Sequence, residues 1–61
     1  MATEQVFVIL APGFEEIEAV TVVDVLRRAG VSVQTASLTG ESPVEGAHGV
    51  AIAADRAFET V

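Results

Sequence analysis

The sequence predicts an α/β fold built on a doubly wound parallel sheet, and three observations lead to that prediction. An apolar, β-branched run at residues 6–10 is typical of a central parallel strand covered on both faces. A Pro-Gly turn ends this run, and an amphipathic helical pattern follows over residues 15–29. A second strand pattern at residues 31–38 completes a strand–helix–strand unit of about 33 residues, typical of a right-handed parallel crossover.

The first strand is expected over residues 6–11, after a polar lead-in at residues 1–5. Pro12 has no N–H to donate to a sheet, so the strand ends there, and Gly13 permits the backbone angles of a tight turn. Ligands of open α/β sheets bind where strands end and helices begin. This turn is therefore the first place to look for a site.

The helix expected over residues 15–29 begins with three acids, Glu15, Glu16 and Glu18. At about 100° per residue, Glu15 and Glu18 fall inside the apolar arc of the helix and Glu16 lies at its margin. Acids in a first turn complement the helix dipole, and this structural interpretation is favoured for Glu15 and Glu16. For Glu18 a structural role and a buried site acid stay equally open, because burying a carboxylate is costly unless a partner satisfies it.

The end of this helix carries ordinary signals. Gly30 is expected to cap it, and Arg27 and Arg28 complement the dipole in its last turn. Residues 39–43 then form a turn cluster, and short strands at 44–45 and 50–53 are expected to pair as a hairpin at the sheet margin. Asp55 is expected to cap a short helix that starts near residue 56, with Ala57, Phe58 and Val61 as its apolar contacts.

Composition excludes several functions. The net charge of −6, with no lysine, argues against binding to nucleic acid or to anionic membranes. No apolar run is long enough for a spanning helix and no basic leader begins the chain, so a cytoplasmic protein is expected. There is no cysteine, and His48 lacks partners at metal-ligand spacing, so no metal is expected and His48 is interpreted as a loop residue. The glycines form no dinucleotide-binding motif, and we expect no cofactor.

Beyond these patterns, two stretches carry a family resemblance: VILAPGFEEIEAV at residues 8–20 and DVLRRAGV at residues 24–31. They closely resemble the opening of the ThiJ/PfpI superfamily, in the branch of the parkinsonism-associated deglycase and its bacterial chaperone-like (YajL-like) relatives. The resemblance continues through Gly40, Pro43 and Val44 to Ala54-Asp55. It implies a flavodoxin-like (Rossmann-like) sheet, of which residues 1–61 form the N-terminal part.

The resemblance also implies a chemistry. In that family a cysteine on a later nucleophile elbow is the reactive centre, the glutamate matching Glu18 hydrogen-bonds to it, and the one matching Glu15 lies nearby. Two optional family cysteines correspond here to Gly46 and Ala53, so a redox role for those thiols is not implied. The implied activity is a cofactor-free glyoxalase or deglycase, a hydrolase or lyase acting on methylglyoxal-type aldehydes or their protein adducts, or a stress-response chaperone. The alternative is a non-catalytic chaperone or a ligand-sensing regulator domain of the same fold.

Three expectations concern partners and burial. Glu18 is expected to be largely buried at the carboxyl edge of the sheet. The remainder of the protein, with the cysteine, is expected as a second chain, because a unit of 61 residues buries too little surface to be stable alone. A two-fold homodimer is expected through one face of the first helix, in agreement with the family's usual dimer. That face comprises Ile17, Val20, Thr21, Asp24 and Arg28.

Overall fold

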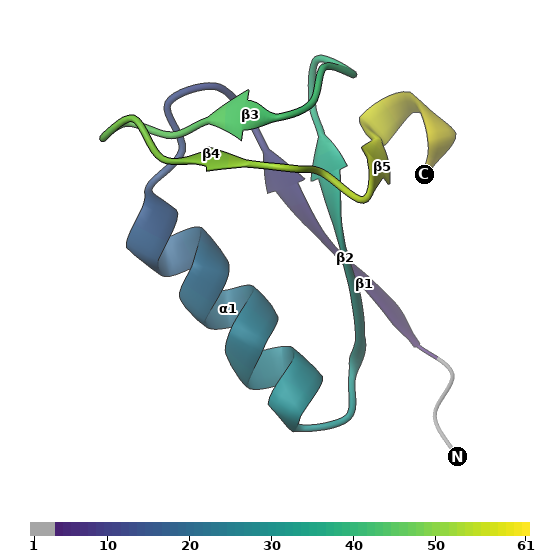
Figure 1. The fold of residues 1–61 in the computed structure, drawn as a ribbon. Coiled ribbons are helices and arrows are strands. Elements are labelled where there is room, and N and C mark those ends of the chain that lie inside the picture. The colour runs from purple at the N-terminus through teal and green to yellow at the C-terminus, as the bar shows by residue number, and fades with distance from the viewer. Residues whose placement is uncertain (1–3) are drawn as a thin grey trace.

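The structure is a computed structural model that describes residues 4–61 (Figure 1). Part of the expected polar lead-in, residues 1–3, lies outside the described residues. In chain order the elements are β1 (Gln5–Leu10), α1 (Glu16–Arg28), β2 (Ser32–Ser37), β3 (Val44–Glu45), β4 (Ala51–Ile52), β5 (Arg56–Ala57) and a 3-10 helix, η1 (Phe58–Thr60).

The predicted strand–helix–strand unit is confirmed. β1 and β2 pair in parallel along their whole length, from Gln5 opposite Ser32 to Leu10 opposite Ser37. The observed bounds differ from the expected ones by one residue at each end of the strands and the helix. Within residues 4–61 the sheet order is β1-β2-β5, so β2 is central and β1 lies at an edge. The expected central position of β1 is therefore wrong for the described residues, and the expected cover on both faces is incomplete, since Ile9 is 40% exposed.

Helix α1 covers one face of this sheet, as Figure 1 shows. The buried apolar side chains come from three elements and comprise Leu10, Val33, Ala36 and Val44. The helix ends as predicted, because Gly30 adopts a φ of 83° that favours glycine. From the last turn, Arg27 donates to the Val33 carbonyl from Nη2 (2.9 Å) and Nε (3.3 Å), which joins helix to strand.

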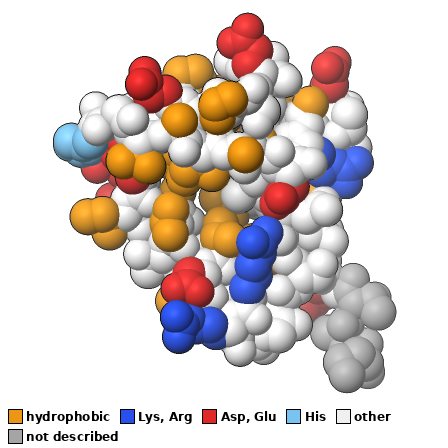
Figure 2. All heavy atoms as spheres, in the orientation of Figure 1, with side chains coloured by type: hydrophobic (Ala, Val, Ile, Leu, Met, Phe, Trp, Pro, Cys, Tyr) orange, Lys and Arg blue, Asp and Glu red, His pale blue; other side chains and the backbone are white. Residues whose placement is uncertain are grey.

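The predicted hairpin is also confirmed, as a separate antiparallel pair of β3 and β4. It crosses the end of the sheet at which β1 stops and α1 begins (Figure 1). Val44 pairs with Ile52, and the side chain of Val44 is buried in the core. In the same orientation, Figure 2 shows hydrophobic side chains gathered between α1 and this hairpin.

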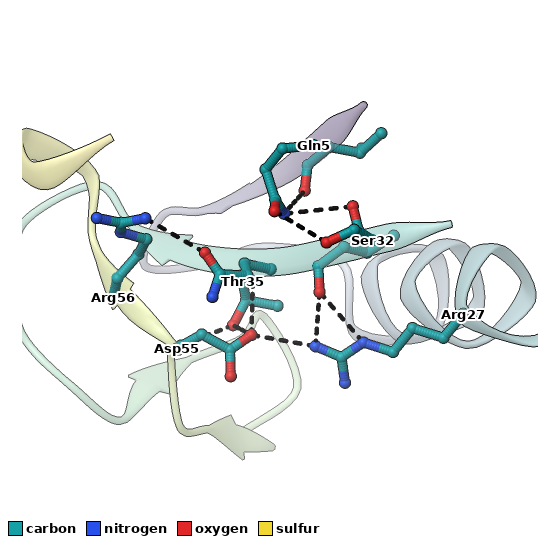
Figure 3. A network of polar contacts seen from close by, with 9 residues as sticks. Gln5, Arg27, Ser32, Thr35, Asp55 and Arg56 are labelled. Carbon is teal, nitrogen blue, oxygen red and sulfur yellow. Dashed lines mark hydrogen bonds and ion pairs between the residues drawn. The ribbon is translucent and has the colours of Figure 1, made fainter. Parts of the chain in front are cut away.

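The helix expected near residue 56 is wrong. Arg56 and Ala57 instead form β5, parallel to β2, and only residues 58–60 turn into a 3-10 helix. Asp55 does not cap this helix, because its carboxylate accepts hydrogen bonds from the Thr35 N–H (2.8 Å) and the Thr35 hydroxyl (3.2 Å) of β2 (Figure 3). A tertiary contact thus holds an aspartate that local pattern alone assigns to a cap. Among residues 4–61, no helix is long and apolar enough to cross a membrane.

Candidate functional site

The Pro-Gly turn that joins β1 to α1 is held from both sides. Gly13 adopts a φ of 88°, as the sequence allows, and the Phe14 N–H donates to the Ala11 carbonyl within the turn (3.0 Å). The Gly13 N–H donates to the Glu45 carbonyl of β3 (2.8 Å), and the Phe14 carbonyl accepts from the Ala47 N–H (2.8 Å). The start of α1 is therefore attached to the hairpin through backbone groups.

Glu16 is the acid that the fold buries, with only 8% of the residue exposed. Its Oε2 accepts hydrogen bonds from the backbone N–H of His48 (2.6 Å) and of Val50 (3.2 Å). Its Oε1 lies 2.9 Å from Nδ1 of the His48 ring. One carboxylate in the first turn of α1 thus accepts hydrogen bonds from two backbone N–H groups of the loop between β3 and β4 and contacts its histidine ring.

Gly46 makes room for this carboxylate. A Cβ at position 46 would lie 2.5 Å from Cδ and 2.6 Å from Cγ and Oε2 of Glu16, closer than real Cβ contacts come. Glu16 is buried and held by three groups of the loop, so its side chain cannot yield without losing those bonds. A Cβ at position 46 would therefore force the Glu16 side chain to move, whereas glycine leaves it room without any unusual φ.

The contacts of Glu16 set the charge of the pair. Burial alone raises the pKa of Glu16, but the hydrogen bonds from the His48 ring and from the backbone N–H groups lower it to about 2. The hydrogen bond to Glu16, followed by the charges of Glu16 and Glu15, raises the pKa of His48. A carboxylate and an imidazolium thus stabilise each other beside the amino end of α1.

The other two acids are placed differently. Glu15 is the N-cap residue of α1, and its side chain makes no capping hydrogen bond. Glu18 is exposed, so the expected burial of its side chain is wrong for this chain. Within residues 4–61, neither side chain takes part in an ion pair. Of the three acids, only Glu16 binds another part of the described chain through its side chain, and Glu15 and Glu18 remain exposed.

A groove of about 350 Å³ lies between α1 and β4. Its apolar wall includes Ala19, Val20, Val23, Ile52 and Ala53. Asp24, Arg27 and Asp55 add charged groups to its lining. Figure 2 shows this face of the molecule, with hydrophobic side chains beside basic and acidic ones.

The helix face expected at a dimer interface is exposed. Ile17 is 83% and Val20 is 49% exposed. Asp24 and Arg28 form an ion pair one helical turn apart (3.0 Å), so these two charges meet within the chain. Among the described residues, no three His, Asp or Glu side chains lie where they could hold a metal ion.

Comparison with known proteins decides the family. The sequence profile of the DJ-1/PfpI family matches residues 4–61. The chain belongs to the DJ-1/PfpI family. A curated relative, the Parkinson disease protein 7 homolog of Danio rerio, is 48% identical over 59 residues, which are 97% of this chain and 31% of that protein.

Solved structures of DJ-1 proteins have the same fold. Drosophila melanogaster DJ-1beta matches with a TM-score of 0.93 and 42% identity over 98% of this chain and 32% of that one. Toxoplasma gondii DJ-1, in an oxidised form, matches with a TM-score of 0.90 and 42% identity over 93% of this chain and 31% of that one. The fold is thus the flavodoxin-like α/β fold of DJ-1 proteins, and the chain spans about a third of the length of these relatives.

The resemblance to the ThiJ/PfpI superfamily stated from the sequence is therefore confirmed by the match to the DJ-1/PfpI family.

Sequence reasoning missed the contact between Glu16 and His48. His48 was interpreted as an ordinary loop residue, and Glu16 as a first-turn acid. The available signal was weak: a single histidine between Gly46 and Gly49, in a loop expected to join two short strands. Which acid reaches the loop depends on the docking of the hairpin, which no local pattern encodes.

Proposed function

We propose that this chain is the N-terminal segment of a cysteine-dependent member of the DJ-1/PfpI family and supplies the acids of its active site. The complete protein, meaning this chain together with the remainder that the longer relatives have, would act without a cofactor. Its substrates would be small aldehydes such as methylglyoxal or their adducts with proteins. The remainder, in the same polypeptide or as a second chain, would bring the nucleophilic cysteine, and the complete protein would be cytoplasmic.

The observation that carries this proposal is that the three acids differ in their contacts and exposure. Glu16 binds the hairpin, whereas Glu15 and Glu18 are exposed at the start of α1, directly after the turn that ends β1. These two are the acids that the family resemblance assigns to the site. In open α/β sheets, ligands bind where strands end and helices begin, which is the location of this turn.

Glu18 is given the main chemical role. Enclosed by the remainder, its carboxyl would lie between the thiol and the amino end of α1. A protonated Glu18 would donate a hydrogen bond to the thiolate, or the group would transfer a proton as general acid and base. Glu15 would lie nearby and add negative charge.

The experiment is Glu18→Gln in the complete protein, with the rates of thiol alkylation and of methylglyoxal consumption measured. Both rates should fall, by about a hundredfold where a general acid–base contribution is lost, while the circular dichroism spectrum stays unchanged. Glu41→Gln, at an exposed acid outside the turn, is the matched control and should leave both rates unchanged. Unchanged rates in Glu18→Gln would overturn the proposal and favour a non-catalytic chaperone or a ligand-sensing domain.

A further inference from the structure

Hydrogen bonds join the hairpin both to the start of α1 and to the Pro-Gly turn before it. Two backbone hydrogen bonds connect the Pro-Gly turn to β3 and its loop: the Gly13 N–H donates to the Glu45 carbonyl, and the Ala47 N–H donates to the Phe14 carbonyl. The carboxylate of Glu16 adds contacts to the N–H groups of His48 and Val50 and to the His48 ring. The orientation of this turn is thus fixed by the hairpin as well as by the sheet.

Within the described residues, the side chain of Glu18 makes no such hydrogen bond to the hairpin. It is exposed, and its direction follows from the rotation of α1 about its axis. Glu16 and Glu18 are two residues apart, so they point about 200° from each other around the helix. A contact that holds Glu16 against the hairpin therefore also fixes the direction in which Glu18 points.

We propose that Glu16, seated in the space that Gly46 leaves, is a positioning residue that orients Glu18 toward the reactive thiol. This inference rests on the proposed function, because it takes Glu18 as the acid that acts on the thiol. Glu16 itself touches neither substrate nor cysteine in this proposal. Its role matters because a misplacement of about 1 Å at a reacting group can cost about a hundredfold in rate.

The test uses two substitutions that empty or block the same contact in the complete protein. Glu16→Ala removes the carboxylate. Gly46→Ala removes no polar group but puts a Cβ where the Glu16 side chain lies, so that side chain must move. Each should lower kcat for methylglyoxal by about tenfold or more with KM little changed, because orientation and not binding is lost. Each should also move the pH profile of thiol alkylation in the same direction as Glu18→Gln.

The double variant sharpens the test. Glu16→Ala removes the three atoms that lie nearest to the Cβ of Gly46→Ala, so the two losses should not add. Glu16→Gln is the rescue control. Its amide oxygen can still accept from the N–H groups of His48 and Val50, so it should keep more of the rate than Glu16→Ala.

The outcomes separate this inference from the proposed function. If Glu18→Gln lowers the rates while Glu16→Ala and Gly46→Ala keep wild-type kcat and pH profile, the positioning role is overturned and the proposed function stands. If Glu18→Gln has no effect, the proposed function itself fails. Additive losses in the double variant, or a loss of thermal stability without a shift of the pH profile, would reduce Glu16 to a structural residue and overturn the inference. If Glu16→Ala does not fold, Gly46→Ala alone decides the matter.

Discussion

Thr35 and Asp55 exchange hydrogen bonds in both directions. The Asp55 carboxylate accepts from the N–H and the hydroxyl of Thr35, and the Asp55 N–H donates to Oγ1 (2.9 Å) and to the carbonyl (3.1 Å) of Thr35. Arg27 of α1 reaches the same carboxylate oxygen at 3.1 Å (Figure 3). The pair therefore joins three parts of the chain: the central strand, the helix and the segment that leads into β5.

The first prediction is that Asp55→Asn destabilises the complete protein by about 1–2 kcal/mol. Hydrogen bonds to a charged group contribute about 1.5–3 kcal/mol, and the 40% exposure of the Asp55 side chain reduces this through solvent screening. The N–H of Thr35, first, and then its hydroxyl and Arg27 hold the pKa of Asp55 below its ordinary 3.8. A carboxyl with a lowered pKa stabilises the fold above its ordinary pKa, and this contribution disappears as the pH falls through the lowered value. Urea denaturation between pH 2 and 7 measures both the loss of stability and its dependence on pH.

The matched control is Asp24→Asn. Asp24 also forms an ion pair with an arginine, but that pair with Arg28 is exposed and lies along one helix. Such pairs contribute only about 0.3–0.5 kcal/mol. Equal losses in the two variants would contradict the special role given to Asp55.

The second prediction concerns His48. Its pKa is raised above the ordinary 6.5, by the hydrogen bond to Glu16 and then by the charges of Glu16 and Glu15. A group with a raised pKa stabilises the fold fully below its ordinary pKa, and the contribution is lost as the pH rises through the raised value. An NMR titration of the His48 ring in the complete protein should give a pKa above 6.5 in the wild type and a lower one in Glu16→Gln.

A second variant separates the ring from the backbone contact. In His48→Ala the N–H of residue 48 still reaches Glu16, so the loop should stay attached while the part of the pH dependence that comes from the His48 ring disappears from the unfolding free energy. The comparison is made as the difference between variant and wild type at each pH. An identical pH dependence in the two proteins would show that the ring contact does not form in solution.

The helical period, the apolar run and the Gly30 cap predicted the strand–helix–strand unit from the sequence, because each is a local signal. The end of the chain could not be predicted in the same way. Asp55 before an apolar segment is an N-cap signal, but its partners on Thr35 lie 20 residues earlier, on the neighbouring strand. The hydrogen bonds of a third parallel strand outweighed the weak helical preference of residues 56–61.

The candidate site was predictable to a similar extent. The turn and its acids were identified from the order of strand, Pro-Gly and helix, and the roles of Glu15 and Glu18 came only through the family resemblance. The space at Gly46 could not be predicted from the sequence, because it exists only once the hairpin has docked on the first turn of α1. The exposure of Glu18 differs from the expected burial because no described segment packs over that side of the turn.

The third prediction is that Gly13→Val destabilises the complete protein by about 1–2 kcal/mol, the cost of left-handed backbone for a residue with a side chain. Gly13 has a φ of 88°, and a Cβ there would meet no atom within 4 Å, so the cost is conformational and not steric crowding by neighbours. Gly13→Asn should cost less, since asparagine adopts left-handed angles more readily. Thermal unfolding of both variants measures this, and equal midpoints would contradict the conformational explanation.

The fourth prediction is that Ile17→Glu weakens the homodimer expected through α1 by at least about tenfold in Kd, or about 1.4 kcal/mol. Ile17 is 83% exposed in the single chain, and at a two-fold interface the new glutamate would lie near its own copy. Like charges brought together at an interface repel, and the chain already carries a net charge of −6. Because the side chain is exposed, the fold of each subunit should be unaffected.

Sedimentation equilibrium of the complete protein at micromolar concentration measures this effect, with Ile17→Leu as the control that keeps an apolar side chain. The wild type and Ile17→Leu should be dimers, Ile17→Glu should shift toward monomer, and added salt should partly restore its dimer by screening the repulsion. Asp24 and Arg28 already pair within one helix, so Arg28→Ala should weaken the dimer less than Ile17→Glu. A wild-type monomer at this concentration would contradict the helix-mediated dimer, and a dimer untouched by Ile17→Glu would place the interface on another surface.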